Sequence, residues 1–361
     1  STHCISSAAS DVYKRQVERG EGVTYPQTKL ALHRLVTDGV VPGVSYSFID
    51  GDRVENGVIR NEELVTQTEP LRPGMLYDVA SLTKVVGTLS VVLQLLAQGR
   101  LHLTDLVSDW LPQWQDSRVT IQHLLTHTSG ITGYIPHRDQ LAAPELTAAL
   151  LKLHVGPTFN RQMVYADVNY IFLGWIVEQI LQQPIQTVAQ QRVLTPLGMQ
   201  HSTFTPTNAE QCVPTAVTAE RGVIRGMVHD PKGLVLQRRC GSAGLFSTVA
   251  DLTRFCQAYL RPEAAATVLP PQWVHHLLSD WTPTHQAGRS LGWALTTAQW
   301  PTAHRVIWHS GFTGTYLVID PLMQQAMVFL TNRVHPIAPN EPYLDQRNAV
   351  ISTYLAEKSR Q

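Results

Sequence analysis

Apolar positions follow a helical spacing through the middle of the chain and a strand-like spacing near both ends. Residues 26–39, P-Q-T-K-L-A-L-H-R-L-V-T-D-G, begin with proline, carry apolar residues three and four apart and end in glycine, which predicts a helix. Two β-rich runs flank Asp50-Gly51-Asp52 and predict a hairpin. Further helices are predicted over 81–98, 120–127, 145–153, 168–182, 184–192 and 248–260.

Strand signals return only late in the chain. They cover 291–296, 305–309, 315–320 and 326–331, and a last helix is predicted from about Tyr343 to Glu357. This order predicts an α+β fold with one antiparallel sheet built from both chain ends, flanked by helices, and an inserted all-helical lobe. We expect residues 17–75 and 285–361 to form the sheet lobe and residues 76–284 the helical lobe of one domain.

The first sixteen residues do not share these patterns. They lack a charged start followed by an apolar core, so no signal peptide is recognised. Within them, D-V-Y-K-R-Q resembles the translation of a transposon end used to make sequencing libraries, and residues 1–16 are interpreted as a non-native leader. A cytoplasmic location is slightly favoured, and export stays open because we expect the native N-terminus to be missing.

Composition and charge narrow the classes of function. Lysine plus arginine and aspartate plus glutamate each number 28, so no basic field favours nucleic acid as a partner. The longest apolar run, about 85–97, is too short and too polar to predict a membrane span. The four cysteines show no metal or disulfide spacing. Function is therefore expected from a local site for a small molecule or peptide, and the oligomeric state is not predicted.

One polar pair opens an otherwise apolar helix. In V-A-S-L-T-K-V-V, residues 79–86, Ser81 and Lys84 are three positions apart and fall on one helix face. A serine hydroxyl needs an adjacent base to act as a nucleophile, and a desolvated lysine favours the neutral form that accepts a proton. On its own, the S-x-x-K spacing is also typical of an ordinary helix start with a solvated lysine.

Two more polar clusters follow along the chain. Tyr165-Ala166-Asp167 precedes an apolar helical run, where Asp167 is expected at the helix N-cap and Tyr165 packs as an ordinary aromatic residue. Residues 309–315, H-S-G-F-T-G-T, form a glycine-rich interruption between two strand-like runs. This interruption is typical of a turn or bulge, and its small residues also let a substrate lie along the strand edge.

Taken in order, these three clusters resemble the serine β-lactamase and penicillin-binding protein superfamily, where S-x-x-K, Y-x-[ND] and [KH]-[TS]-G recur. The class C and esterase-like branch is also resembled at H-L-L-T-H-T-S-G-I (123–131), P-L-G-M (196–199), G-S-A-G-L-F-S-T-V-A-D-L (241–252) and T-N-R-V-H-P (331–336). The resemblance covers about residues 26–357. It implies a β-lactamase/transpeptidase-like fold and a single catalytic domain.

The resemblance also implies a serine hydrolase acting on an ester or amide, either a small ester, a D-amino-acid peptide or a β-lactam. Ser81 would form an acyl-enzyme, and Lys84 and Tyr165 would share proton transfer. The N–H groups of Ser81 and Phe312 would hold the oxyanion, with Ser310 and Gly311 lining the strand beside the substrate. His309 would lie near Tyr165 or the substrate.

Two departures from the superfamily pattern favour an esterase or a D-peptidase over a β-lactamase. His309 stands where many members have lysine, and we expect it to switch its charge near pH 6.5. Asp167 replaces the usual asparagine, so an ionised Asp167 cannot donate a hydrogen bond to a substrate amide. Both changes weaken the recognition of an anionic penicillin.

Other functions receive less support. His123 and His127 have the spacing of two zinc ligands, but H-E-x-x-H and a third ligand are missing, so a hydrogen-bonded histidine pair is expected and no metal is predicted. The chain has no G-x-S-x-G, no Walker loop and no G-x-G-x-x-G, so no cofactor is predicted. The alternative to an enzyme is a non-catalytic, penicillin-binding-type sensor or structural protein of the same fold.

Overall fold

The computed structural model describes residues 25–60, 71–336 and 341–358, and the interpretation of residues 1–16 as a leader lies outside these ranges. Within them, one antiparallel sheet has the strand order β2-β1-β12-β11-β10-β9. Its strands are β1 (Gly43–Asp50), β2 (Arg53–Arg60), β9 (Ala294–Ala298), β10 (His304–Gly311), β11 (Thr315–Asp320) and β12 (Gln325–Thr331). In β1 and β12, Val44 lies opposite Thr331, so the two ends of the chain meet inside one sheet.

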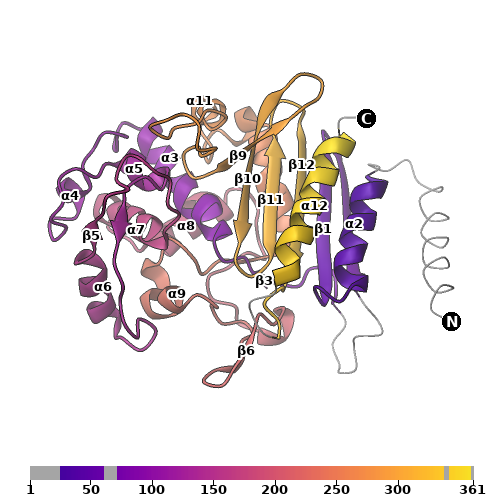
Figure 1. Cartoon of the computed structure of the whole chain (residues 1–361), viewed down its shortest axis with the longest axis horizontal. Helices are drawn as coiled ribbons and strands as arrows, with labels where there is room; N and C mark the ends of the chain where they lie inside the picture. Colours follow the sequence, from indigo (N-terminus) through magenta and orange to yellow (C-terminus); the bar gives the residue numbers. More distant parts are fainter. Residues whose placement is uncertain (1–24, 61–70, 337–340, 359–361) are drawn as a thin grey trace.

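Helices cover both faces of this sheet. The terminal helices α2 (Pro26–Thr37) and α12 (Glu341–Glu357) pack together on one face, as Figure 1 shows. Helix α10 (Val249–Leu260) contacts β1, β11 and β12. Strand β11 is buried along its whole length because Val318 joins the core under the terminal helices while Leu317 and Ile319 join the core on the other face.

The segment between β2 and β9 forms a mainly helical lobe. Its helices are α3 (Ser90–Ala97), α4 (Val107–Trp110), α5 (Ile121–Leu125), α6 (Ala143–Leu151), α7 (Asp167–Leu181), α8 (Ile185–Ala189), α9 (Pro231–Leu236) and α11 (Pro271–His276). Short 3₁₀ turns occupy Ala209–Gln211, Gln237–Arg239 and Pro262–Ala265, and π-helical turns occupy Lys84–Leu89 and Gln190–Leu194. Helix α7 is buried on nearly every side from Val168 to Val177, so it forms the centre of this lobe.

Three details differ from the sequence expectation. The inserted lobe is not entirely helical, because it contains three pairs of two-residue strands: β3 (Tyr77–Asp78) with β8 (Phe246–Ser247), β4 (Ile131–Thr132) with β5 (His154–Val155), and β6 (Val217–Thr218) with β7 (Gly222–Val223). Helix α10 lies in the range assigned to the helical lobe but packs on the sheet. The strand expected over 291–296 begins at Ala294 because Gly292 has φ of 83° and its N–H bonds to Leu125 instead.

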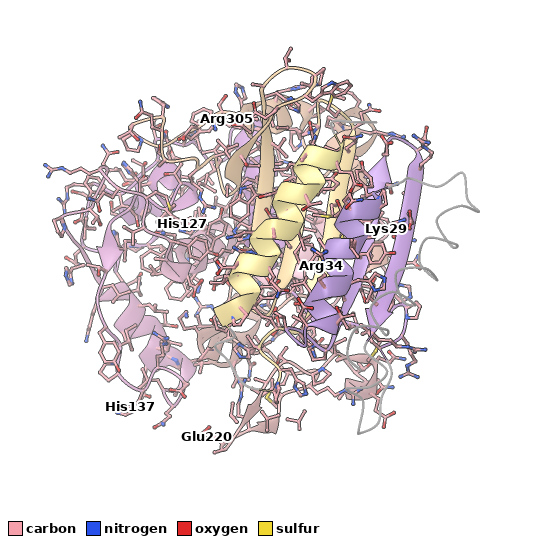
Figure 2. The ribbon with its side chains drawn as sticks, turned by 45° about the vertical axis from the view of Figure 1, so that its right-hand side comes forward. Lys29, Arg34, His127, His137, Glu220 and Arg305 are labelled. Atoms are coloured by element: carbon pink, nitrogen blue, oxygen red, sulfur yellow. The ribbon has the colours of Figure 1, made fainter. Side chains whose placement is uncertain are left out.

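The outer surface of the sheet lobe carries charged side chains. Arg34 is exposed on α2, and Lys29 of the same helix forms an ion pair with Glu55 on β2 (Figure 2).

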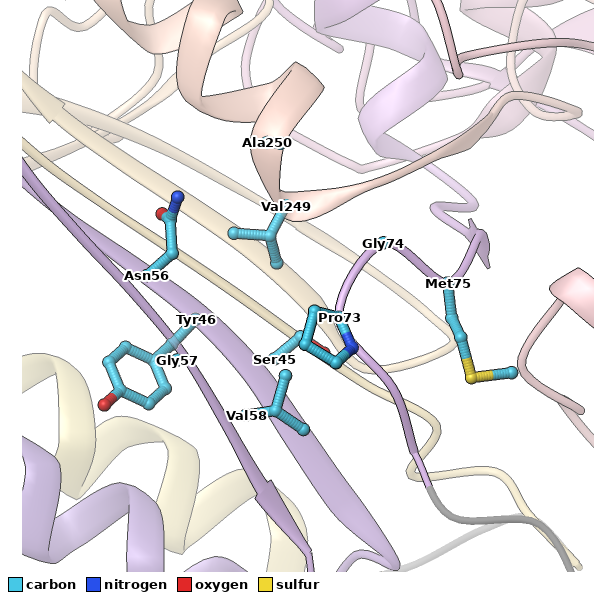
Figure 3. Close-up of a pocket in the computed structure, with 10 residues that line it drawn as sticks. All are labelled: Ser45, Tyr46, Asn56, Gly57, Val58, Pro73, Gly74, Met75, Val249 and Ala250. Atoms are coloured by element: carbon cyan, nitrogen blue, oxygen red, sulfur yellow. The ribbon is translucent and has the colours of Figure 1, made fainter.

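A cavity of about 150 Å³ lies where β1 and β2 approach the start of α10, and Ser45, Val58, Met75 and Val249 are among its lining residues (Figure 3). The hydroxyl of Ser45 there bonds to the buried Tyr77 hydroxyl at 2.9 Å, so it is held as part of the structure.

Candidate active site

A strained turn carries Ser81. The preceding Ala80 has φ of 46°, in the left-handed region that a residue with a Cβ seldom adopts. The buried carboxylate of Asp78 fixes the turn by accepting hydrogen bonds from the Ala80 N–H at 2.9 Å and the His229 N–H at 2.8 Å. Burial raises the pKa of Asp78 to about 6, although these hydrogen bonds act in the opposite direction. The backbone before Ser81 is therefore held by a carboxylate that is itself costly to bury.

Lys84 is completely buried and faces Ser81, as the spacing predicts. Its Nζ donates to Ser81 Oγ at 2.8 Å and to the Ser242 carbonyl at 3.0 Å, and it pairs with Asp167 Oδ1 at 2.8 Å. Three acceptors match the three N–H groups of an ammonium. Burial alone lowers the pKa of Lys84, but the interactions with Asp167 and, to a smaller extent, with Tyr165 outweigh it and hold the pKa above its usual value.

The prediction that Lys84 is neutral is therefore wrong, because its raised pKa makes the side chain a cationic ammonium. A protonated amine has no lone pair, so Lys84 donates to Ser81 rather than accepting its proton. The helix that carries Lys84 also differs from the expected continuous α-helix, because Lys84–Leu89 form a π-helical turn before α3 begins at Ser90. Such turns occur often at functional sites.

Asp167 does not cap its helix. Ala166 is the N-cap residue of α7, and Asp167 is the first helical residue, which turns its carboxylate toward two lysines. One oxygen pairs with Lys84 at 2.8 Å and the other with Lys232 at 3.0 Å. Burial alone raises the pKa of Asp167, but the ammonium groups of the two lysines hold it well below its usual range. Lys232, which the sequence analysis did not single out, also pairs with Asp230 at 3.3 Å.

Tyr165 lies at the rim of this cluster and is 42% exposed. Lys84 Nζ is 5.2 Å from the centre of its ring, and the rings of His127 and His309 lie 4.4 Å and 6.1 Å away. Three distant parts of the sequence thus bring four side chains together, those of Ser81, Lys84, Tyr165 and His309. His127 belongs to this group as well, a role that the two-histidine spacing did not suggest.

His309 on β10 is almost fully buried, with an exposed fraction of 3%. Burial, with the positive charges of Arg289 and Lys84, holds the pKa of His309 well below its usual value. The predicted titration near pH 6.5 is therefore contradicted, and His309 is neutral at physiological pH. Ser310 follows on the same strand and lies opposite Tyr316 of β11.

The end of β10 lies directly against the chain that leads into Ser81. The Thr313 hydroxyl donates to the Asp78 carbonyl at 2.7 Å, and the Thr315 hydroxyl donates to the Val79 carbonyl at 3.1 Å. A Cβ on Gly311 would lie 2.5 Å from the Val79 carbonyl oxygen, so only glycine fits there. Phe312, which follows Gly311, is 52% exposed at the site surface.

Arg289 is a buried cation that the sequence analysis did not single out. Only 8% of it is exposed, and its guanidinium carbon lies 5.8 Å from the centre of the Tyr165 ring. A signal for it was present, since R-S-L-G-W at 289–293 places a charge at the start of an otherwise apolar run with a glycine turn. Such a charge beside buried residues needs a partner.

The two histidines with zinc-like spacing have separate roles. His123 Nδ1 lies 3.1 Å from the Thr120 N–H and completes the N-terminal cap of α5. His127 Nδ1 accepts from the Ala166 N–H at 3.3 Å and lies 2.9 Å from the Asn169 amide. Across the described ranges no group of three histidine, cysteine or acidic side chains could hold a metal ion. In the same ranges, no helix is both long enough and apolar enough to cross a membrane.

Known proteins share this architecture. A protein of Escherichia coli O157:H7, provisionally named a D-alanyl-D-alanine carboxypeptidase, is 27% identical over 340 residues, covering 81% of this chain and 77% of its own. The structure of EstCE1, a hydrolase with promiscuous acyltransferase activity, matches at a TM-score of 0.71 and 20% identity, over 90% of this chain and 97% of that one. The structure of a class C β-lactamase from Rhodobacter sphaeroides matches at a TM-score of 0.69 and 18% identity, over 91% of this chain and 99% of that one.

These likenesses confirm the β-lactamase/transpeptidase-like fold that the motifs imply. The sheet built from both chain ends and the helical insertion agree with that fold over most of the chain. The model of the Beta-lactamase family matches residues 29–350, nearly the whole of the described chain. The chain therefore belongs to the Beta-lactamase family of serine hydrolases.

Proposed function

We propose that the protein hydrolyses an ester or amide through an acyl-enzyme on Ser81. The observation that carries the proposal is the 2.8 Å hydrogen bond from Lys84 Nζ to Ser81 Oγ, made by a buried lysine beside the exposed Tyr165 ring. Because Lys84 donates to the oxygen, the proton of the hydroxyl itself is left for another acceptor. The phenol oxygen of the half-exposed Tyr165, at the open side of the cluster, is our candidate for this acceptor.

In the proposed first step, Ser81 Oγ bonds to the substrate carbonyl carbon while its proton passes to the deprotonated Tyr165 oxygen. The resulting oxyanion is held by the N–H groups of Ser81 and Phe312. Tyr165 then gives the proton to the leaving group, which departs and leaves the acyl chain on Ser81. Water then attacks this ester while Tyr165 takes its proton. The bond between Ser81 Oγ and the acyl carbon breaks, Tyr165 returns the proton to Ser81, and the acid product is released.

Two observations support this placement. The hydrogen bonds from Thr313 and Thr315 fasten the Phe312 turn to the backbone just before Ser81, which favours two N–H groups meeting at one oxyanion. The pairing of Lys84 with Asp167 holds the lysine cationic, so it favours orientation of Ser81 and leaves proton transfer to Tyr165.

For the substrate, we favour a small ester or a D-amino-acid peptide over an anionic β-lactam. His309 is neutral where many relatives have a lysine, so the strand edge lacks the fixed charge that attracts a carboxylate. The exposed Phe312 and Tyr165 rings offer apolar contact area at the rim. The name of the Escherichia coli relative agrees with the peptide class.

A covalent label tests the proposal. A fluorophosphonate probe should add one adduct to the intact protein, on Ser81, and Ser81→Ala should take none. Ser117→Ala, which alters an exposed serine, is the matched control and should label like the wild type. Equal labelling of Ser81→Ala would refute the nucleophile, and reversible penicillin binding without any acylation would support the non-catalytic sensor. Rates with a p-nitrophenyl ester, a cephalosporin and a D-alanyl peptide then define the substrate class.

A further inference from the structure

The charges around Tyr165 leave one cation without an anionic partner. The charge of Lys84 is paired with Asp167, and His309 is neutral. Arg289 is different, because the described residues include no carboxylate paired with its guanidinium. Its Nη1 reaches only the Gly292 carbonyl, at 3.5 Å, and its buried Nε has no hydrogen-bond partner in the described structure.

An unpaired buried guanidinium is costly, because arginine stays charged in proteins. Burial lowers the pKa of Arg289, but arginine begins from a value far above neutral. The nearby Asp280 carboxylate attracts Arg289, but it accepts hydrogen bonds from the Gly288 N–H and the Thr282 hydroxyl. A desolvated cation beside a cluster of polar groups is therefore a candidate for a functional role.

The backbone aims Arg289 at Tyr165. The Arg289 carbonyl accepts from the Trp281 N–H at 3.0 Å, and the Ser290 N–H bonds to the Trp293 carbonyl at 2.8 Å, closing a tight turn. Gly292 in this turn is anchored to Leu125 of the helical lobe. The guanidinium is thereby held 5.8 Å from the centre of the Tyr165 ring.

We propose that Arg289 is a positioning residue that supplies the fixed positive charge facing Tyr165, in the role that a neutral His309 does not fill. The inference rests on the proposed acyl-enzyme function. As Tyr165 gives up and regains its proton, negative charge on its oxygen is stabilised by a cation that keeps its charge throughout. Arg289 forms and breaks no bond, so the proton balance stays as described above.

Several other groups face Tyr165 and share in its electrostatics. They come from the π-helical turn, from α7, from the residues after α5 and from β10, and they are Lys84, Tyr170, His127 and His309. Asp167 acts on this group through its ion pair with Lys84. Both histidines are held neutral by burial and by the neighbouring cations. Arg289 is thus the positive charge in this group that is not matched by a carboxylate.

The test compares Arg289→Gln, Arg289→Met and Arg289→Lys with the control Arg305→Gln. Arg305 is exposed on β10, at the upper edge of the sheet in Figure 2. With a neutral p-nitrophenyl ester, we expect kcat/KM to fall by about 10²–10³-fold in the two uncharged variants. The acidic limb of the pH profile should move to higher pH in both. Arg289→Lys should recover at least tenfold, and Arg305→Gln should match the wild type.

The outcomes separate this inference from the proposed function. If both uncharged variants keep the wild-type kcat/KM and pH profile, the role of Arg289 is overturned. Labelling of Ser81 by the fluorophosphonate would then still support the proposed function. A loss confined to KM for a D-alanyl peptide, absent with the ester, would instead make Arg289 a carboxylate-binding residue. Removal of an unpaired buried cation should not unfold the protein. Failure of both variants to fold by circular dichroism would show a structural role and overturn the inference.

Discussion

The two ion pairs of Asp167 allow a prediction about stability. Asp167→Asn keeps the shape of the side chain but removes the charge that Lys84 and Lys232 share at 2.8 Å and 3.0 Å. Removing one partner of a buried ion pair costs about 3–5 kcal/mol, because the remaining charge is left uncompensated. The Asp167 side chain is 28% exposed and asparagine keeps one acceptor oxygen, so the lower end, about 3 kcal/mol, is expected.

For a chain of 361 residues, an unfolding entropy of about 2.1 cal/mol/K per residue converts a loss of about 3 kcal/mol into a fall in Tm of roughly 4 °C at pH 7. The matched control is Asp116→Asn, which breaks a pair with Arg118, whose side chain is 57% exposed. Surface pairs contribute little, so this control should change Tm far less. Thermal unfolding followed by circular dichroism at one scan rate measures both variants.

The pH dependence of this difference follows from the lowered pKa of Asp167 in the folded state. A lowered carboxyl pKa contributes stability that is present above the unfolded value of about 3.9 and is lost as the pH falls through the folded value. The Tm gap between wild type and Asp167→Asn should therefore be constant from about pH 5 to 8 and shrink below about pH 4. A Tm equal to that of Asp116→Asn at pH 7, or a gap that persists unchanged at pH 3, would refute the reasoning.

Four further predictions concern the site and the sheet. Gly311→Ala should abolish hydrolysis with an intact fold, since the added methyl would meet a carbonyl oxygen at 2.5 Å, and activity within twofold of wild type would contradict this. Lys84→Ala and Tyr165→Phe should each reduce kcat/KM severely, and the double variant should lose less than the product of the single losses, because the residues act as a unit. Burial and neighbouring cations hold the pKa of His309 well below its usual value, so His309 should not make the ratio of kcat/KM for a cephalosporin to that for a neutral ester depend on pH between about 5.5 and 8.5. A pH dependence of this ratio that differs between His309→Gln and the wild type would contradict the prediction. Asp320→Asn should destabilise the protein by about 3–5 kcal/mol in chemical unfolding, because the buried carboxylate holds a histidine and a buried lysine, and a loss under about 1 kcal/mol would disprove it.

The predictable part of the fold came from local patterns. The runs that became β11 and β12 are apolar, β-branched and bounded by turns, and their ends match the expected ones within one residue. Ser81, Lys84 and Tyr165 can be predicted as site residues because each lies in a short motif of fixed spacing, and their catalytic roles stay a prediction. The division into sheet and helical lobes stays a prediction, and the packing of α10 on the sheet shows why patterns alone place such a helix poorly.

The unpredicted part of the site depends on contacts between distant segments. Lys232 reaches Asp167 from a separate helix. The other oxygen of Asp167 pairs with Lys84, and this second pair reverses the expected charge state of Lys84. Arg289 reaches Tyr165 through a turn whose direction is set by the backbone of Gly292. No local spacing encodes such approaches, because they arise only when segments far apart in the chain are packed together.

The pairing of β1 with β12 also governs how the protein is made. Val44 leaves the ribosome long before its partner Thr331, which follows 287 residues later in the chain. At a translation speed of about 5–20 residues per second, the apolar edge of β1 waits on the order of tens of seconds for its neighbour. During that interval the nascent hairpin presents an unpaired strand edge, which is a template for aggregation. Chaperones that bind extended apolar segments are therefore expected to engage this protein during translation, before the last strand closes the sheet.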